Sequence, residues 1–281
     1  MSITLNQWQR ARTSVPEVLE RLLTLLDGAP PDLPATAHWT IADTVAHLAT
    51  IAATDVALVR GPAGDPSPSV VRELRLNTTV DTVAAMNRIV MSKYTERSVP
   101  VLAARLRADV AELLAATEDV DPEREIIWLG GANLPIAGLL AHLVNELNIH
   151  AWDIARALRR PWYTDPRDAA MFVDLFLVGV TRCGYGKLLD HDRPVRPGRI
   201  SVTFRAGVSE PVTMALVDGR VVLEELDPRP DVRVSYDPVV FNLMLFGRVS
   251  KARAALTGRV RVAGRRPWLL PEFMATMRLP S

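Results

Sequence analysis

The chain has 281 residues, 48% of them hydrophobic, and its 33 basic and 32 acidic residues leave a formal net charge of +1. This balance gives no electrostatic reason to expect nucleic acid or an anionic membrane surface as a partner. The single cysteine, Cys183, excludes an intramolecular disulfide and a cysteine-rich zinc site.

The N-terminal segment is polar within its first ten residues and lacks the apolar core of a signal peptide. No apolar run approaches the roughly 18–20 residues that cross a bilayer. We therefore expect a soluble, cytoplasmic protein that is long enough for two domains, each with a substantial core.

The first half of the chain has apolar residues at helical spacing, interrupted by glycine and proline. Helices are predicted over residues 3–27, from Thr40 to about residue 60, and over 70–97, 99–117 and 139–158. Pro16 predicts a kink or break in the first helix. Thr40 and Asp43 have the spacing of a capping box, and Asn133 is a plausible N-cap before the central helix. These helices predict an antiparallel four-helix bundle, a fold that builds metal sites between facing helices.

The second half changes to alternating apolar residues after a further predicted helix over 166–190. Strands are predicted over 200–204, 212–216, 221–225, 232–234 and 259–262, and short helices over 238–246, 250–256 and 267–277. Asp218-Gly219 is a strong hairpin signal between two of these strands. The fold class is thus α+β with two domains: a helical bundle over 1–164 and a small α+β domain with an antiparallel sheet over 165–281.

The central helix carries the most informative pattern. His142, Glu146 and His150 follow one another at i,i+4 spacing, and Asp153 follows three residues later. Residues four apart lie on one helical face, here beside an apolar stripe that faces the core. An unpaired charge next to a core is costly, so this glutamate and its histidines must be paired, protonated or bound to a metal.

A metal site needs one more ligand from another helix, and His47 is the candidate. His47, Glu146 and His150 would supply two imidazoles and one carboxylate, a set that suits zinc and leaves a fourth position open, as in catalytic sites. Asp43 or Asp153 could orient the outer nitrogen of a ligating histidine. The pattern also allows a simpler interpretation, because Glu/His pairs at this spacing often arise by chance.

Other chemically active residues have more ordinary interpretations. His142 could replace His47 as a ligand, act as a base or simply pack in the core. We expect His38 to be a loop residue and His191 to be solvated. Cys183 is expected to be a small core residue. Arg156 and Arg160 could hold a substrate carboxylate, although surface arginines would look the same.

Two segments resemble a known family. His38-Trp39-Thr-Ile-Ala-Asp43-Thr-Val-Ala-His47-Leu resembles the Trp-x-x-x-Asp-x-x-x-His-Leu signature of the mycothiol-dependent maleylpyruvate isomerase family, one of the DinB-like metal-binding helical bundles. Glu146-Leu-Asn-Ile-His150-Ala-Trp152-Asp153 resembles its second signature, Glu-x-x-x-His-x-Trp-Asp. The resemblance implies that His47, Glu146 and His150 bind zinc.

The segment over residues 254–264 resembles the late strand of sterol-carrier-protein-like domains, which accompany the bundle in that family. The chain departs from the family just before Glu146, where Val144 and Asn145 stand and an arginine is often found. This difference leaves the binding of an anionic substrate group without its usual residue.

The resemblance implies an enzyme that binds Zn²⁺, or another divalent metal, and activates a low-molecular-weight thiol, mycothiol. The thiol would add to a small electrophilic substrate for cis-trans isomerisation, or would be transferred to it; catalytic residues beyond the metal ligands are not predicted. Two alternative functions are considered as well. The second domain could carry an apolar ligand along residues 241–246, or the bundle could bind metal without catalysis.

Overall fold

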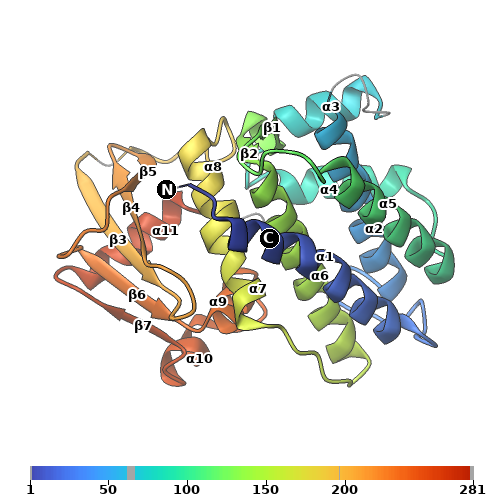
Figure 1. Ribbon diagram of the computed structural model, residues 1–281. Helices are drawn as coiled ribbons and strands as arrows, with labels where there is room; N and C mark the ends of the chain where they lie inside the picture. The colour runs from blue at the N-terminus through green and yellow to red at the C-terminus, as the bar shows by residue number, and fades with distance from the viewer. Residues whose placement is uncertain (1, 62–66, 196, 279–281) are drawn as a thin grey trace.

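A bundle of helices and a five-stranded sheet lie on opposite sides of one helical segment, residues 166–183, in the computed structural model (Figure 1). The structure describes residues 2–61, 67–195 and 197–278. The arrangement confirms the predicted fold class, a helical N-terminal domain followed by a small C-terminal sheet domain. The boundary between residues 164 and 165 stays a prediction.

Four long helices form the bundle: α1 (Leu5–Leu26), α2 (Ile41–Arg60), α5 (Val99–Ala116) and α6 (Ile136–Ala157). Helix α2 begins with the predicted capping box, in which the Thr40 hydroxyl accepts from the Asp43 backbone N–H and the Asp43 carboxylate accepts from that of Thr40. Helix α1 continues through Pro16, so of the two predicted effects a break is wrong, and a kink stays a prediction. Helix α2 packs against α5 and α6, and α1 also contacts both.

The predicted helix over 70–97 is two helices, α3 (Ser69–Leu76) and α4 (Val83–Lys93). The break between them is built by side-chain and tertiary hydrogen bonds: the Thr82 hydroxyl accepts from the Thr79 backbone N–H, and the Val80 backbone N–H donates to Leu188. Threonine hydroxyls that bond the local backbone in this way compete with a continuing helix.

Helix α6 begins earlier than predicted, and its expected N-cap is wrong. Asn133 lies in β2 (Asn133–Pro135), which pairs with β1 (Glu125–Ile127) around the turn η2 (Leu129–Gly131). Its backbone N–H donates to Gly184. This short hairpin has only three residues per strand, too few for a clear alternation in the sequence.

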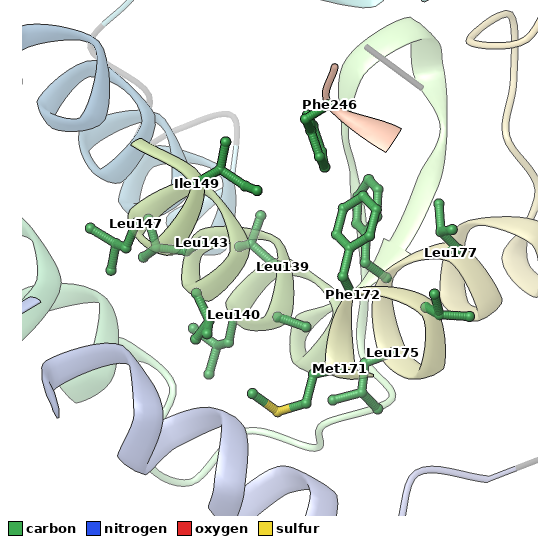
Figure 2. Close-up of a cluster of buried hydrophobic side chains, with 14 of the residues drawn as sticks. Leu139, Leu140, Leu143, Leu147, Ile149, Met171, Phe172, Leu175, Leu177 and Phe246 are labelled. Carbon is green, nitrogen blue, oxygen red and sulfur yellow. The ribbon is translucent and has the colours of Figure 1, made fainter. Parts of the chain in front are cut away.

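The core is centred on α6, which is buried on nearly every side. Leu139, Leu143 and Phe172 belong to one cluster of buried side chains, and Phe246 reaches this cluster from the C-terminal domain (Figure 2). Gly138 allows the close approach, because a Cβ there would lie 2.9 Å from the Leu175 carbonyl oxygen. The packing of α6 against the following helical segment is therefore tight at backbone level.

That segment comprises α7 (Pro166–Met171), the π-helical turn η3 (Phe172–Leu177) and α8 (Val178–Cys183). It ends at Cys183 with Gly184 at φ 104°, so the prediction of a helix to residue 190 is too long. A positive φ of this kind favours glycine and stops a helix.

The sheet has the order β5-β4-β3-β6-β7, formed by β3 (Arg199–Arg205), β4 (Val212–Val217), β5 (Arg220–Glu224), β6 (Val232–Tyr236) and β7 (Val260–Ala263). Neighbours are antiparallel except β3 and β6, which pair in parallel, so the prediction of a purely antiparallel sheet is wrong. Alternation identifies strands but does not fix which strands pair. The Asp218-Gly219 turn is confirmed, with positive φ at both residues.

The remaining helices of the C-terminal domain are α9 (Pro238–Leu245), α10 (Lys251–Leu256), η4 (Pro267–Leu269) and α11 (Leu270–Thr276). Helix α9 packs against α7, which brings the end of α9 close to the bundle. This contact is the structural basis for a connection between the two domains.

One described helix, α2, is long and apolar enough to cross a membrane by length and composition, so the prediction that no apolar segment has this length is wrong. In the fold, 67% of its most apolar window is buried. The apolarity of α2 is thus used in packing against the other helices of the bundle.

Asp174, in the π-helical turn, gives a pH-dependent stability prediction. Burial raises the pKa of this carboxyl to about 6, although the Ser209 hydroxyl acts in the opposite direction. The raised pKa means that the folded state favours the neutral acid, so this contribution to stability is present at low pH and is lost as the pH rises through about 6. We expect Asp174→Asn to raise the free energy of unfolding at pH 8 by roughly 1–3 kcal/mol, since a pKa difference of one unit between the folded and unfolded states corresponds to about 1.4 kcal/mol.

Urea denaturation of wild type and Asp174→Asn at pH 8 and pH 4.5 measures the effect. The gain should shrink at the lower pH, and the exposed control Asp192→Asn should show no such trend. An equal gain at both pH values would contradict the assignment.

Candidate metal centre

The face of α6 predicted to carry chemistry is assembled around one carboxylate. His150 Nε2 lies 3.3 Å from Glu146 Oε2, and His142 Nε2 lies 3.5 Å from the other oxygen, Oε1. Each histidine is one helical turn from the glutamate, so both reach it on the same face. The two oxygens of Glu146 therefore face different imidazoles.

Helix α2 places His47 beside the same carboxylate. His47 Nε2 lies 3.8 Å from Glu146 Oε2, the oxygen that His150 also faces, and the two imidazole rings are 5.2 Å apart in an edge-on arrangement. Candidate ligand atoms of His47, Glu146 and His150 all lie within 4.8 Å of one another. The structure thus brings together the three residues predicted as ligands from segments about a hundred residues apart.

Trp39 covers this group at the entry to α2. Its ring centroid lies 4.6 Å from that of His47 and 6.0 Å from that of His150. The Trp39 backbone N–H donates to the Thr36 hydroxyl, which fixes the loop before the helix. The tryptophan of the first signature therefore shields both imidazoles and restricts their orientation.

His142 lies beside the three-residue group and faces an aromatic wall. Its ring is 5.0 Å from the ring of Trp128 and 5.0 Å from that of Phe176. Its Nδ1 is buried without a hydrogen-bond partner among the described residues. His142 does not share the oxygen that faces His47 and His150, so it is placed as a neighbour of the candidate ligands.

The protonation of the group suits metal binding. Burial alone would raise the pKa of Glu146, but the hydrogen bond from His150 and the charges of the three histidines bring it to about 2. Burial, with the nearby charge of His150, lowers the pKa of His47 to about 3. At neutral pH the glutamate is therefore an anion and His47 a neutral imidazole, the forms in which both bind metals.

His150 differs because it has acids on both sides. Burial would lower its pKa, but contacts with Asp153 and Glu146 outweigh burial and raise it. Its Nδ1 lies 3.6 Å from Asp153 Oδ2. Of the two acids considered for the outer nitrogen of a ligating histidine, Asp153 is therefore the one that lies there. Asp153 is 3% exposed and is held in turn by Arg248 from the C-terminal domain.

Asp55 is a further buried acid on α2, two turns beyond His47, and the sequence reasoning missed it. Burial and the negative charge of Glu146 raise its pKa well above the ordinary value, against the effect of Arg75. Its spacing of eight residues from His47 was the available signal, because residues eight apart return to one helical face.

Asp43, the other acid considered for the outer nitrogen of a ligating histidine, instead contacts Thr40 and Arg97. Its Oδ2 accepts from Thr40 in the capping box, and its Oδ1 accepts from Arg97 Nε at 2.7 Å. These contacts explain why its pKa is lowered even though burial would raise it. Asp43 thus fixes the start of α2 and the position of Arg97.

The remaining candidates lie away from this group or have other partners. Arg156 is exposed and stacks over Trp152, and Arg160 donates to the Leu25 carbonyl. His38 is exposed, as expected for a loop residue, and His191 accepts from the Arg193 backbone N–H.

Cys183 lies at the end of α8 and is half-buried, whereas a position in the core was predicted. Burial raises the pKa of its thiol, with the Arg182 side chain acting in the opposite direction. A reactive cysteine requires a lowered pKa, so its environment does not favour a nucleophilic role.

Comparisons with known proteins identify the family of the segment that carries this site. The family model described as the mycothiol maleylpyruvate isomerase N-terminal domain matches residues 14–155, which contain all three candidate ligands. No curated protein matches the chain. Two solved structures are similar over 91% of this chain and 92% of theirs: the mycothiol-dependent maleylpyruvate isomerase, at 13% identity and a TM-score of 0.50, and a histidine-to-alanine variant of that enzyme, at 14% and 0.53. At these identities the likeness shows the fold.

The position of Asp43 predicts a stability effect separate from the candidate ligands. Asp43→Ala removes the acceptor for Thr40 and the partner of Arg97, and loss of such a cap costs about 0.5–2 kcal/mol. Urea denaturation should show this loss, and Asp43→Asn, which retains an acceptor, should show a smaller one. An alanine variant as stable as wild type would contradict the capping role.

Proposed function

The chain belongs to the mycothiol maleylpyruvate isomerase family, and from this we propose that it is a metal-dependent enzyme that activates a low-molecular-weight thiol. The thiol, mycothiol by analogy with the named relatives, adds to a small electrophile, which is then isomerised or retained as a thiol conjugate. The single observation that carries the proposal is the convergence of His47, Glu146 and His150 within 4.8 Å.

These residues would hold one divalent cation, zinc in our proposal. A set of two imidazoles and one carboxylate fits zinc and leaves a position for an exogenous ligand. When bound there, the metal supplies a positive charge that lowers the pKa of a coordinated thiol, so that the thiolate is available at neutral pH. The site belongs to the proposed first domain, residues 1–164.

The surrounding side chains determine the local environment. Trp39 packs against the imidazoles of His47 and His150, and Asp153 lies 3.6 Å from the outer nitrogen of His150, which has no other partner among the described residues. In our proposal Asp153 orients His150 at this nitrogen. Trp128 and Phe176 exclude water on the side of His142. A nucleophile in such a shielded site is less solvated than in water, and electrostatic effects on it are stronger.

The carrier hypothesis is less well supported. An apolar cavity does lie in the C-terminal domain, lined by residues of η3, the sheet, α9 and the end of the chain: Val173, Leu177, Phe204, Met214, Phe241, Leu245, Met274 and Met277. Its volume is only about 10 Å³, the space of about one water molecule. A sterol or acyl chain would require this core to open.

Metal analysis tests the ligand assignment. Purified wild type should contain about one zinc ion per chain after exposure to zinc and desalting, and His150→Ala should retain far less, because removal of a ligand opens the site. His191→Ala is the matched control, since His191 lies outside the candidate group. Equal zinc content in wild type and His150→Ala would reject the assignment.

A conjugation assay tests the chemistry. With mycothiol and a haloaromatic electrophile, zinc-loaded wild type should accelerate loss of the free thiol over the uncatalysed reaction. His47→Ala should abolish the acceleration, and a matched incubation without mycothiol should show no turnover. If the zinc-loaded protein accelerates neither the conjugation of haloaromatics nor the isomerisation of maleylpyruvate, the non-catalytic metal-binding alternative is favoured.

A further inference from the structure

The C-terminal domain reaches the candidate metal centre through one arginine. Arg248 Nη2 donates to Asp153 Oδ2 at 2.7 Å, and its Nε donates to Oδ1 at 3.2 Å. Both oxygens of the buried carboxylate are thus held by one guanidinium in a forked contact. Such bidentate pairs fix geometry more strictly than a single hydrogen bond.

Arg248 is itself fixed by the end of α9. Its backbone N–H donates to the Leu243 carbonyl at 2.7 Å, and its Nη1 donates to the Phe246 carbonyl at 2.5 Å. Phe246 packs against Phe172, with ring centroids 5.4 Å apart. The guanidinium is therefore anchored to the C-terminal domain while it contacts an acid of α6.

Asp153 transmits this constraint to a candidate ligand. The oxygen that receives the shorter bond from Arg248, Oδ2, is also the oxygen 3.6 Å from His150 Nδ1. His150 Nε2, on the opposite side of the ring, faces Glu146. Acids at the outer nitrogen of a ligating histidine set its tautomer and orientation, and their loss typically lowers metal affinity roughly 10–100-fold.

We propose that Arg248 is a positioning residue of the metal centre, which holds Asp153 against His150 and so makes the docked C-terminal domain part of the site. The inference rests on the metal site proposed above. It predicts that metal binding and the docking of the α9–Arg248 segment favour each other, because coupling between two equilibria is reciprocal.

A second ion pair provides a matched comparison. Arg10 of α1 binds Asp168 of α7 at 2.7 and 2.8 Å, and Asp168 is as buried as Asp153, at 4% and 3% exposed. Among the described contacts, Asp168 has none with the three candidate ligands. Buried ion pairs add little net stability over apolar packing, yet removal of one partner is costly. Both pairs should therefore affect folding similarly, and only one should affect the metal.

Zinc affinity of the full-length protein, measured by competition with a chromogenic chelator, tests the proposal. Arg248→Met should weaken zinc binding by roughly 10–100-fold. Arg248→Lys, which keeps the charge but not the fork, should fall between Arg248→Met and wild type. Arg10→Met should bind zinc like wild type, although its metal-free form should lose thermal stability comparably. Where Arg248→Met fails to fold, Arg248→Lys carries the same test.

Combination with Asp153→Asn separates positioning from general damage. If Arg248 acts through Asp153, the double variant should bind zinc no more weakly than Asp153→Asn alone. Wild-type zinc affinity in folded Arg248→Met, or an equal loss in Arg10→Met, would overturn the inference. A wild type that binds no zinc would instead reject the metal centre itself, so the two failures are distinguishable.

Discussion

The structure depends on the burial of one ionised carboxylate among imidazoles. Glu146 presents one oxygen to His47 and His150 and the other to His142, in the interior of a helical bundle. A charge in that environment is stable only when its neighbours compensate for the lost water. The same compensation, two imidazoles converging on one carboxylate oxygen, produces a donor set that fits a divalent cation.

The rest of the molecule positions this group. The capping box at Thr40 fixes where α2 starts and hence the height of His47, while Gly138 allows η3 to pack closely on α6. From the other side, Arg248 brings the C-terminal domain into contact with Asp153. The domains are thus joined at the residues next to the candidate ligands, which connects the fold to the chemistry proposed for it.

Much of this was accessible from the sequence, because it depends on local periodicity. The i,i+4 spacing of Glu146 and His150 and the start of α2 at Thr40 are properties of single helices. The contact between Arg248 and Asp153 is different: these residues are 95 positions apart, and no local pattern relates them. The parallel pairing of β3 with β6 and the break before α4 were not predicted for a similar reason: both involve backbone hydrogen bonds between distant segments, in the second case from Val80 to Leu188.

X-ray absorption at the zinc edge, recorded on the zinc-loaded protein before and after addition of mycothiol, would report whether His47, Glu146 and His150 hold a metal that accepts the thiol. We expect zinc ligands of nitrogen and oxygen only, with imidazole scattering from two histidines, and a new sulfur scatterer at about 2.3 Å after the thiol is added. A first shell unchanged by the thiol, or zinc without imidazole ligands, would contradict it.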